Sequence, residues 1–153
     1  GIDPVKAGFD AALEFQPRWR DLGKPSWRSF LGKLFFKLGL GQSHYNNLFY
    51  DYNRTVSRMV NTKVPDYRRF LSVCPQWDTS PRRKQDAVIL MNSTTKLYGQ
   101  WLDLSIKKTL NKDNQIIFIN AWNEWAEGNH LEPCQKWGLS YLEETRKILQ
   151  KYV

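Results

Sequence analysis

The sequence predicts an α/β fold in which parallel strands alternate with helices. Short apolar runs and longer amphipathic segments follow one another along the 153 residues, which is the pattern of strands joined by helical crossovers. The clearest strand is 115–121, because a continuous β-branched and aromatic run of this length is typical of a parallel strand covered on both faces. We expect residues 1–153 to form a single domain, since this length suits one hydrophobic core.

The first half of the chain contains one predicted strand and two predicted helices. Residues 9–15 mix aromatic and small apolar side chains and stop before Pro17, which cannot donate to a strand ladder, so they predict a strand. Ser26 is a suitable N-cap for a helix over 26–38, with apolar side chains on one side and lysines on the other. Residues 45–61 carry apolar side chains at helical spacing and predict a further helix.

The second half continues the alternation. Residues 70–74 are a short apolar run closed by a proline and predict a buried strand. Residues 86–91 predict a brief extra strand or a buried loop. A helix over 92–110 can be capped by its first or second residue, and the amphipathic segment 137–152 predicts a closing helix.

The positive charge of the chain is concentrated in one stretch. The formal net charge is +8, and residues 18–44 hold six basic side chains against one acid. We interpret 18–44 as a basic insertion that carries the amphipathic helix of 26–38. This helix either binds an anionic membrane surface or packs on the body of the protein with its lysines in solvent. The sequence shows no zinc-finger spacing, RNP-type strand or helix-turn-helix pattern, so we do not expect a nucleic-acid partner.

Several other classes are excluded. No apolar run is long enough for a membrane-spanning helix. Cys74 and Cys134 are isolated, which fits neither a disulfide framework nor a zinc site and suits a reducing compartment. We therefore expect no metal and a cytoplasmic location, peripheral to the inner membrane if the basic helix binds lipid. The opening residues lack a signal peptide, and a first residue of Gly indicates a fragment.

The carboxyl ends of the predicted strands are where a ligand site is expected, because parallel α/β sheets bind ligands at that edge. Three short stretches follow the strands that predict the sheet: 14–16, 76–78 and 122–128. Functional side chains are therefore to be sought in these stretches.

The third stretch contains a pair of carboxylates, Glu124 and Glu127, between and beside two indoles. Two nearby carboxylates disfavour joint ionisation, so one can act as an acid while the other stays anionic, which is what glycosidic-bond chemistry requires. Tryptophan faces next to them can stack on sugar rings. The alternative is that the two glutamates solvate a loop and pair with arginines of the chain.

Further residues are candidates for substrate binding. Asp78 could bind sugar hydroxyls, and Arg82 or Arg83 could hold Asp78 or an acidic group of the substrate; the alternative is a loop salt bridge. Glu14 lies at a strand end and could line the pocket. For His130 we favour a hydrogen-bonded loop role over catalysis. The substrate-binding candidates are Glu14, Trp77, Asp78, Arg82, Trp122, Asn123, Trp125 and Glu132.

These residues carry a resemblance to a known family. The string IIFINAWNEWAEGNHLEP (116–133), followed by Trp137-Gly138, resembles the C-terminal signature of the WbsX-type family, glycosyltransferases of bacterial surface polysaccharide assembly. FDAALEFQP (9–17) and PQWDTSPR (75–82) resemble two further motifs of that family. The family is in turn similar to glycoside hydrolase family 99, which contains endo-α-mannosidases and endo-mannanases.

The resemblance implies a mechanism for the carboxylate pair. In the hydrolases the first glutamate of the motif acts on the sugar 2-hydroxyl and the second is the general acid and base, which correspond here to Glu124 and Glu127. Two departures are visible: Ala126 stands where the hydrolases have histidine, and Cys134 stands where the WbsX-type pattern has aspartate. The loop 78–80 also differs from the usual asparagine-threonine pattern.

The resemblance also implies a (β/α)8 barrel, which typically takes about 250 residues. We therefore expect residues 1–153 to be a partial domain, the C-terminal portion of such a barrel, with the missing N-terminal half as a partner. An incomplete barrel exposes a strand edge and apolar faces.

The function that we expect is the making or cleaving of glycosidic bonds in a bacterial surface polysaccharide. An Asp-x-Asp element and a glycine-rich phosphate loop are both missing from the sequence, so no cofactor or metal-bound nucleotide sugar has a visible anchor, which favours direct carboxylate chemistry. The alternative is a non-catalytic module that binds glycans or the membrane surface in a polysaccharide assembly system.

Overall fold

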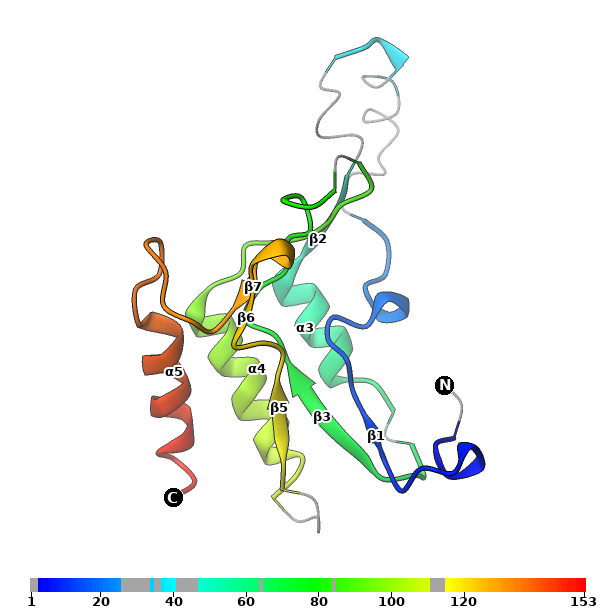
Figure 1. Cartoon of the computed structure of the whole chain (residues 1–153), viewed down its shortest axis with the longest axis vertical. Coiled ribbons are helices and arrows are strands. Elements are labelled where there is room, and N and C mark those ends of the chain that lie inside the picture. Colours follow the sequence, from blue (N-terminus) through cyan, green and yellow to red (C-terminus); the bar gives the residue numbers. More distant parts are fainter. Residues whose placement is uncertain are drawn as a thin grey trace.

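The fold was analysed in a computed structural model that describes residues 3–25, 34, 37–40, 47–63, 65–83, 85–110 and 115–153. One sheet has three parallel strands in the order β1-β3-β5 (Figure 1). A helix follows each strand in the chain, so the predicted α/β alternation is confirmed. The strands of this sheet are β1 (Ala12–Leu13), β3 (Arg69–Val73) and β5 (Ile117–Ile119), and the helices are α3 (Tyr52–Val60), α4 (Thr95–Lys107) and α5 (Ser140–Leu149).

A second, two-stranded parallel sheet is formed by the strands that precede α3 and α4 in the chain. Strands β2 (Leu48–Asp51) and β4 (Val88–Met91) immediately precede α3 and α4 and pair from Leu48↔Val88 to Asp51↔Met91. Of the two alternatives for 86–91, a brief strand or a buried loop, the structure has the strand, over Val88–Met91. The helix predicted over 45–61 is wrong in its first part, because Leu48 to Tyr50 pair with β4, and Asp51 caps the helix by accepting the Arg54 amide at 2.9 Å.

The other helices agree with the sequence pattern to within a few residues. Helix α4 starts at the Thr94 cap, whose hydroxyl accepts the Leu97 amide, rather than at 92 or 93. Helix α5 lies inside the predicted 137–152. The basic helix predicted over 26–38 falls largely outside the described residues. In the described part of the chain, no helix has both the length and the apolar character to cross a membrane.

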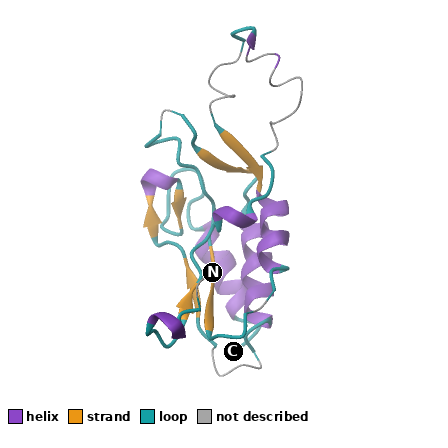
Figure 2. Cartoon of the chain, turned by 90° about the vertical axis from the view of Figure 1, so that its right-hand side faces the viewer, coloured by secondary structure: helices purple, strands orange, loops and turns teal. Residues whose placement is uncertain are grey.

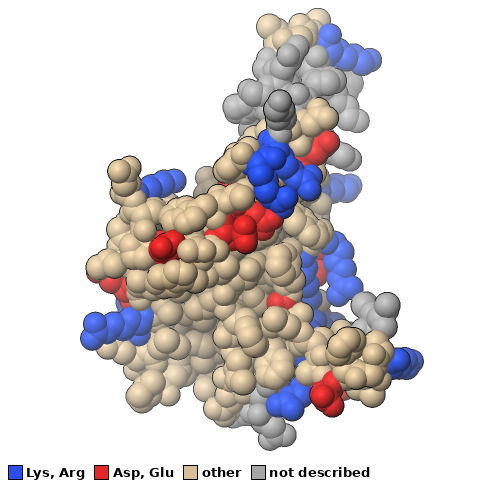
Figure 3. Space-filling model, viewed as in Figure 1, with Lys and Arg blue, Asp and Glu red and all other residues tan. Residues whose placement is uncertain are grey.

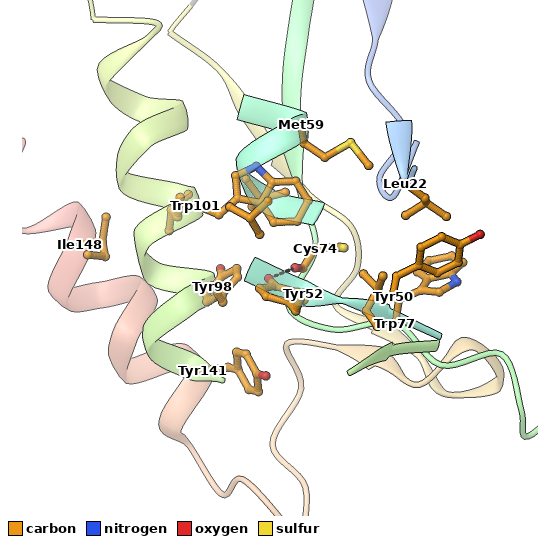
Figure 4. Close-up of a cluster of buried hydrophobic side chains, with 14 residues drawn as sticks. Leu22, Tyr50, Tyr52, Met59, Cys74, Trp77, Tyr98, Trp101, Tyr141 and Ile148 are labelled. Carbon is orange, nitrogen blue, oxygen red and sulfur yellow. Dashed lines mark hydrogen bonds between the residues drawn. The ribbon is translucent and has the colours of Figure 1, made fainter. Parts of the chain in front are cut away.

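The helices cover one side of the three-stranded sheet (Figure 2). Val73 lies in the core and Ile117 and Ile119 pack against it from the sheet, so alternate side chains of β3 and β5 face α3 and α4. Figure 4 shows the core as a layer of aromatic and aliphatic side chains between these helices and the strands. Its buried members are Leu22, Tyr50, Tyr52, Val56, Met59, Val73, Cys74, Trp77, Leu90, Tyr98, Trp101, Leu102, Tyr141 and Ile148.

The opposite side of this sheet carries exposed apolar side chains. Leu13 and Phe15 are 55% and 56% exposed, and Phe118 of β5 and Ile116, which directly precedes β5, are also exposed. The rings of Phe70 and Phe118 meet edge to face at 5.9 Å on the same side. The described strands thus form open sheets with one uncovered apolar face, which we call the open face.

Two core tyrosines hold the backbone just after β3. The Tyr52 hydroxyl donates to the Cys74 carbonyl at 2.6 Å, and the Tyr141 hydroxyl donates to the Pro75 carbonyl at 3.4 Å. Burial raises the pKa of Tyr52 and of the free thiol of Cys74, so both groups stay protonated. Cys74 is thus a buried free thiol.

Replacing Tyr52 by phenylalanine tests this anchor. The change leaves the Cys74 carbonyl without its hydrogen bond inside the core, and we expect the free energy of unfolding to fall by about 1–3 kcal/mol. Urea denaturation of Tyr152→Phe is the control, since the Tyr152 hydroxyl binds Asp103 near the surface. Equal denaturation midpoints for the two variants would contradict the anchoring role.

Candidate active site

The segments that follow β1, β3 and β5 meet at the carboxyl end of the sheet. The Asn120 side chain donates to the Gln16 carbonyl at 2.6 Å, which joins the segment after β5 to the segment after β1. The Asp78 amide donates to the Glu127 carbonyl at 2.7 Å, which joins the segments after β3 and β5. The three stretches in which the sequence places functional side chains are therefore neighbours.

A small hairpin carries the carboxylate pair. Strands β6 (Asn123–Glu124) and β7 (Asn129–His130) are antiparallel, and the 3-10 turn η3 (Trp125–Glu127) connects them. Gly128 follows with a φ of +54°, which returns the chain into β7. The buried Asn129 amide donates to the Asn120 carbonyl at 2.6 Å and fixes the hairpin to the end of β5.

Glu127 is held by an arginine from the segment after β3. Its carboxylate forms an ion pair with the Arg82 guanidinium, and its side chain is only 15% exposed. Asp78 instead accepts the Ser80 amide at 2.8 Å, as in an Asx turn. Figure 3 shows acidic surface directly beside basic surface in this part of the molecule. In the free chain Arg82 thus contacts Glu127 rather than Asp78.

Glu124 has a different environment from Glu127. It is exposed at the end of β6, and within the described ranges no side chain forms a hydrogen bond or ion pair with its carboxylate. The neighbouring Asn123 donates to Glu132 at 3.0 Å across the hairpin. The hairpin therefore presents one open carboxylate and one that is partly enclosed and paired.

The tryptophans divide into two groups. Trp122 and Trp125 are 55% and 50% exposed and flank the carboxylates. Trp77 is only 1% exposed and lies in the core (Figure 4). Its ring meets those of Phe15 and Trp19 edge to face, with centroids 6.1 and 5.7 Å away. Among the three candidate tryptophans, the structure gives Trp77 a packing role, and Trp122 and Trp125 have an exposed face.

Glu14 is also buried rather than open to a ligand at the hairpin. Its carboxylate lies 3.1 Å from Arg69 and 3.3 Å from Arg18, and it accepts the Gln16 amide at 3.2 Å. The surrounding cavity of about 400 Å³ lies between the sheet and the helices, since Met59 and Trp101 also line it. Glu14 therefore ties β1 to β3 by charge pairing.

Two residues outside the predicted set join the hairpin to β3. Gln76 Nε2 lies 2.8 Å from His130 Nε2, and His130 Nδ1 lies 3.0 Å from the Glu132 carbonyl oxygen. The His130 ring stacks on Trp125 with centroids 4.1 Å apart. His130 thus has the hydrogen-bonded role expected from the sequence. The contact of Gln76 with His130 was not predicted, and the position of Gln76 just after a predicted strand is the only sequence feature that points to it.

Within the part of the chain that the structure describes, no three His, Cys, Asp or Glu side chains lie close enough together to hold a metal ion. The polar groups around the hairpin are instead carboxylates, which accept hydrogen bonds, the Arg82 guanidinium, which donates them, and amides, which do both. Such a set suits recognition of sugar hydroxyls, which both donate and accept hydrogen bonds.

The sheet thus has two carboxylates and two half-exposed indoles beyond its carboxyl end, the edge at which parallel α/β sheets bind ligands. Residues 2–145 match the family described as Glycosyltransferase WbsX, and the chain belongs to this family. Family membership indicates a carbohydrate-related function.

The chain is also similar to two curated relatives, each named uncharacterized protein WxcX, from Xanthomonas campestris pv. campestris strains B100 and ATCC 33913. Each is 31% identical over 152 residues, which is 97% of this chain and 21% of the relative. The chain thus spans about a fifth of the length of these proteins. No solved structure matches it significantly.

Gly128 provides a test of the hairpin's close contact with the segment after β3. A Cβ at Gly128 would lie 3.0 Å from both the carbonyl oxygen and the Cβ of Asp78, whereas a Cβ at Gly138 would meet nothing within 4 Å. The two glycines have nearly the same φ, +54° and +53°. We expect Gly128→Ala to lower the free energy of unfolding by about 1–3 kcal/mol more than Gly138→Ala, because only the first is overpacked. Equal losses in thermal denaturation would show that the contact is not tight.

Proposed function

We propose that this chain supplies the reacting carboxylates of an enzyme that makes or cleaves glycosidic bonds of a bacterial surface polysaccharide. One observation supports the proposal above the others. Glu124 and Glu127 lie on one hairpin at the carboxyl end of a parallel sheet, between and beside two half-exposed indoles. Membership of the WbsX family agrees with a saccharide substrate.

The proposed roles follow the resemblance to family 99 hydrolases. Glu124, which is open to solvent, acts on the sugar 2-hydroxyl, and Glu127 is the general acid and base. The Arg82 ion pair orients the Glu127 carboxylate before the substrate arrives. Trp122 and Trp125 stack on sugar rings, while Asn123 and Glu132 bind hydroxyl groups at the edge of the hairpin. The Asp78 backbone amide donates to the Glu127 carbonyl and so helps to hold the hairpin in place.

Substitution of the two glutamates tests the catalytic proposal. In the complete protein, Glu124→Gln and Glu127→Gln each keep the size of the side chain but remove the acid or base, so we expect turnover to fall by about 10²- to 10⁴-fold. Release of reducing ends from α-mannan measures hydrolysis, and incorporation from a sugar nucleotide measures transfer. Glu143→Gln, on the exposed surface of α5, is the matched control and should keep full activity.

A non-catalytic glycan-binding module is the competing function, and the half-exposed indoles suit it equally well. The same variants separate the two. Unchanged activity in both glutamine variants, together with retained binding of α-mannan in an affinity gel, would contradict catalysis by this hairpin and support a binding module.

The exposed apolar side chains of the open face support the proposal that this sheet is part of a larger barrel. We propose that further parallel strands, from the part of the protein that corresponds to the remaining length of the relatives, pair with the outer strands β1 and β5 and cover Phe15 and Phe118. The support is the exposed apolar surface of the described sheet and the small share of the relatives that the chain spans. Exposed apolar patches of this kind drive association.

The 153-residue chain by itself should therefore self-associate. Phe118→Lys puts a charge in the middle of the open face. In analytical ultracentrifugation over a range of concentrations, we expect this variant to contain a larger fraction of monomer than the unmodified chain at each concentration. Leu149→Lys changes a similarly exposed apolar residue on α5 and should sediment like the unmodified chain. If the unmodified chain is monomeric throughout, the open face does not need a cover.

A further inference from the structure

The His130 ring lies between a hydrogen-bond donor on one side and a hydrogen-bond acceptor on the other. The imidazole is 6% exposed. Its Nδ1 faces the carbonyl oxygen of Glu132 at 3.0 Å, and its Nε2 faces the side-chain amide nitrogen of Gln76 at 2.8 Å. The first neighbour can only accept a hydrogen bond, and the second can only donate one.

These two neighbours select one tautomer of the ring. Nδ1 must carry the proton in order to donate to Glu132, and Nε2 must keep its lone pair in order to accept from Gln76. The Nε2–H tautomer would direct two N–H groups at each other and two lone pairs at each other. Gln76 therefore does for His130 what an outer carboxylate or amide does for a metal-bound histidine: it fixes the ring's orientation.

The oriented imidazole forms the support of Trp125. The two rings have centroids 4.1 Å apart and an interplanar angle of 30°, so they form a tilted stack. Trp125 is nevertheless 50% exposed. One side of the indole thus rests on a buried ring, and solvent reaches the rest of it.

Gln76 is itself attached to the core. The two residues before it have their carbonyl groups held by hydroxyls from two different helices, Tyr52 of α3 and Tyr141 of α5. The contacts form a continuous series from the core tyrosines through Gln76 and His130 to the surface indole. A side chain without such support would have to be ordered by the ligand, at a cost in affinity.

We propose that Gln76 and His130 are positioning residues that hold the Trp125 indole as a preorganised saccharide platform. This inference rests on the proposed function only for the identity of the ligand. The tautomer and the coupling between Gln76 and Trp125 are properties of the free chain.

The tautomer is measured by long-range proton–nitrogen NMR of the 153-residue chain at a pH where the imidazole is neutral. His44 is the other histidine of the sequence, so His44→Asn leaves His130 as the single source of imidazole signals. We expect a protonated Nδ1 and an unprotonated Nε2. A protonated Nε2 would overturn the inference, whatever the activity of the protein.

The coupling is measured at the indole of Trp125, whose N–H resonance is assigned by its loss in Trp125→Phe. Gln76→Leu keeps the approximate size of the side chain and removes the amide, and we expect the Trp125 resonance to move as the stack loosens. Gln100→Leu, on the exposed face of α4, is the matched control and should leave it in place. No movement in Gln76→Leu would show that the imidazole is held without Gln76, which contradicts the inference.

The ligand side is tested with oligosaccharides from an α-mannan digest. If Gln76 acts by positioning the platform, Gln76→Leu should raise KM or Kd roughly three- to ten-fold, the effect of one hydrogen bond, and leave kcat within about two-fold. An unchanged affinity combined with a displaced Trp125 would contradict the platform role. Absence of saccharide binding in the unmodified complete protein would contradict the proposed function instead, and the two NMR results would still decide the positioning pair.

Discussion

The course of the backbone after β3 is the constraint on which the candidate site depends. Helices α3 and α5 each contribute one buried tyrosine hydroxyl, and these bind the consecutive carbonyl groups of Cys74 and Pro75. Three residues later, the Asp78 amide binds the carbonyl of Glu127. Because buried carbonyl groups without partners are costly, each of these contacts restricts the path that the segment can follow. The hairpin is thereby docked against a segment that the core has already fixed.

Buried charge on the helix side of the sheet performs a second structural task. Glu14 is paired with Arg18 and Arg69, and the Ser72 amide lies 3.5 Å from its carboxylate. Removing one member of such a cluster leaves an uncompensated charge in a poorly solvated place, so the cluster favours one alignment of β1 against β3. A carboxylate at a strand end can therefore serve the sheet rather than a ligand. Glu14 and Glu124 both lie at or just after the end of a predicted strand in the sequence, and only the structure shows that Glu14 is buried whereas Glu124 is exposed.

Much of the fold could be predicted from periodicity alone. The strands β3 and β5 and the helices α4 and α5 all lie within or next to their predicted ranges, because each is long enough to show a period or an uninterrupted apolar run. Strand β2 could not be recognised, since Leu48 to Tyr50 continue the helical spacing of α3, and only pairing with β4 makes them extended. The hairpin escaped prediction for a related reason, because strands of two residues carry no period.

The candidate site shows the same division between local and long-range information. Its location followed from the rule that ligands bind at the carboxyl ends of parallel strands, and the segments there do converge. Which side chains would be open could not be predicted. Trp77 and Trp125 each directly follow a polar residue in the sequence, yet one is buried in the core and the other is half-exposed. Trp77 contacts Phe15 and Trp19, which are distant in the chain, whereas Trp125 stacks on His130 within the same hairpin.

The hairpin gives its two carboxylates unequal surroundings, and this inequality bears directly on chemistry. On a continuous helix, residues three apart share one face and would meet similar solvent. Here a strand ends at Glu124 and a tight turn ends at Glu127, so that one side chain is open and the other is enclosed by Arg82 and the segment after β3. Reactions that use two carboxylates in different roles need the two groups to differ in environment. The break between strand and turn supplies that difference within four residues of sequence, and only a fold that brings Arg82 to the hairpin can maintain it.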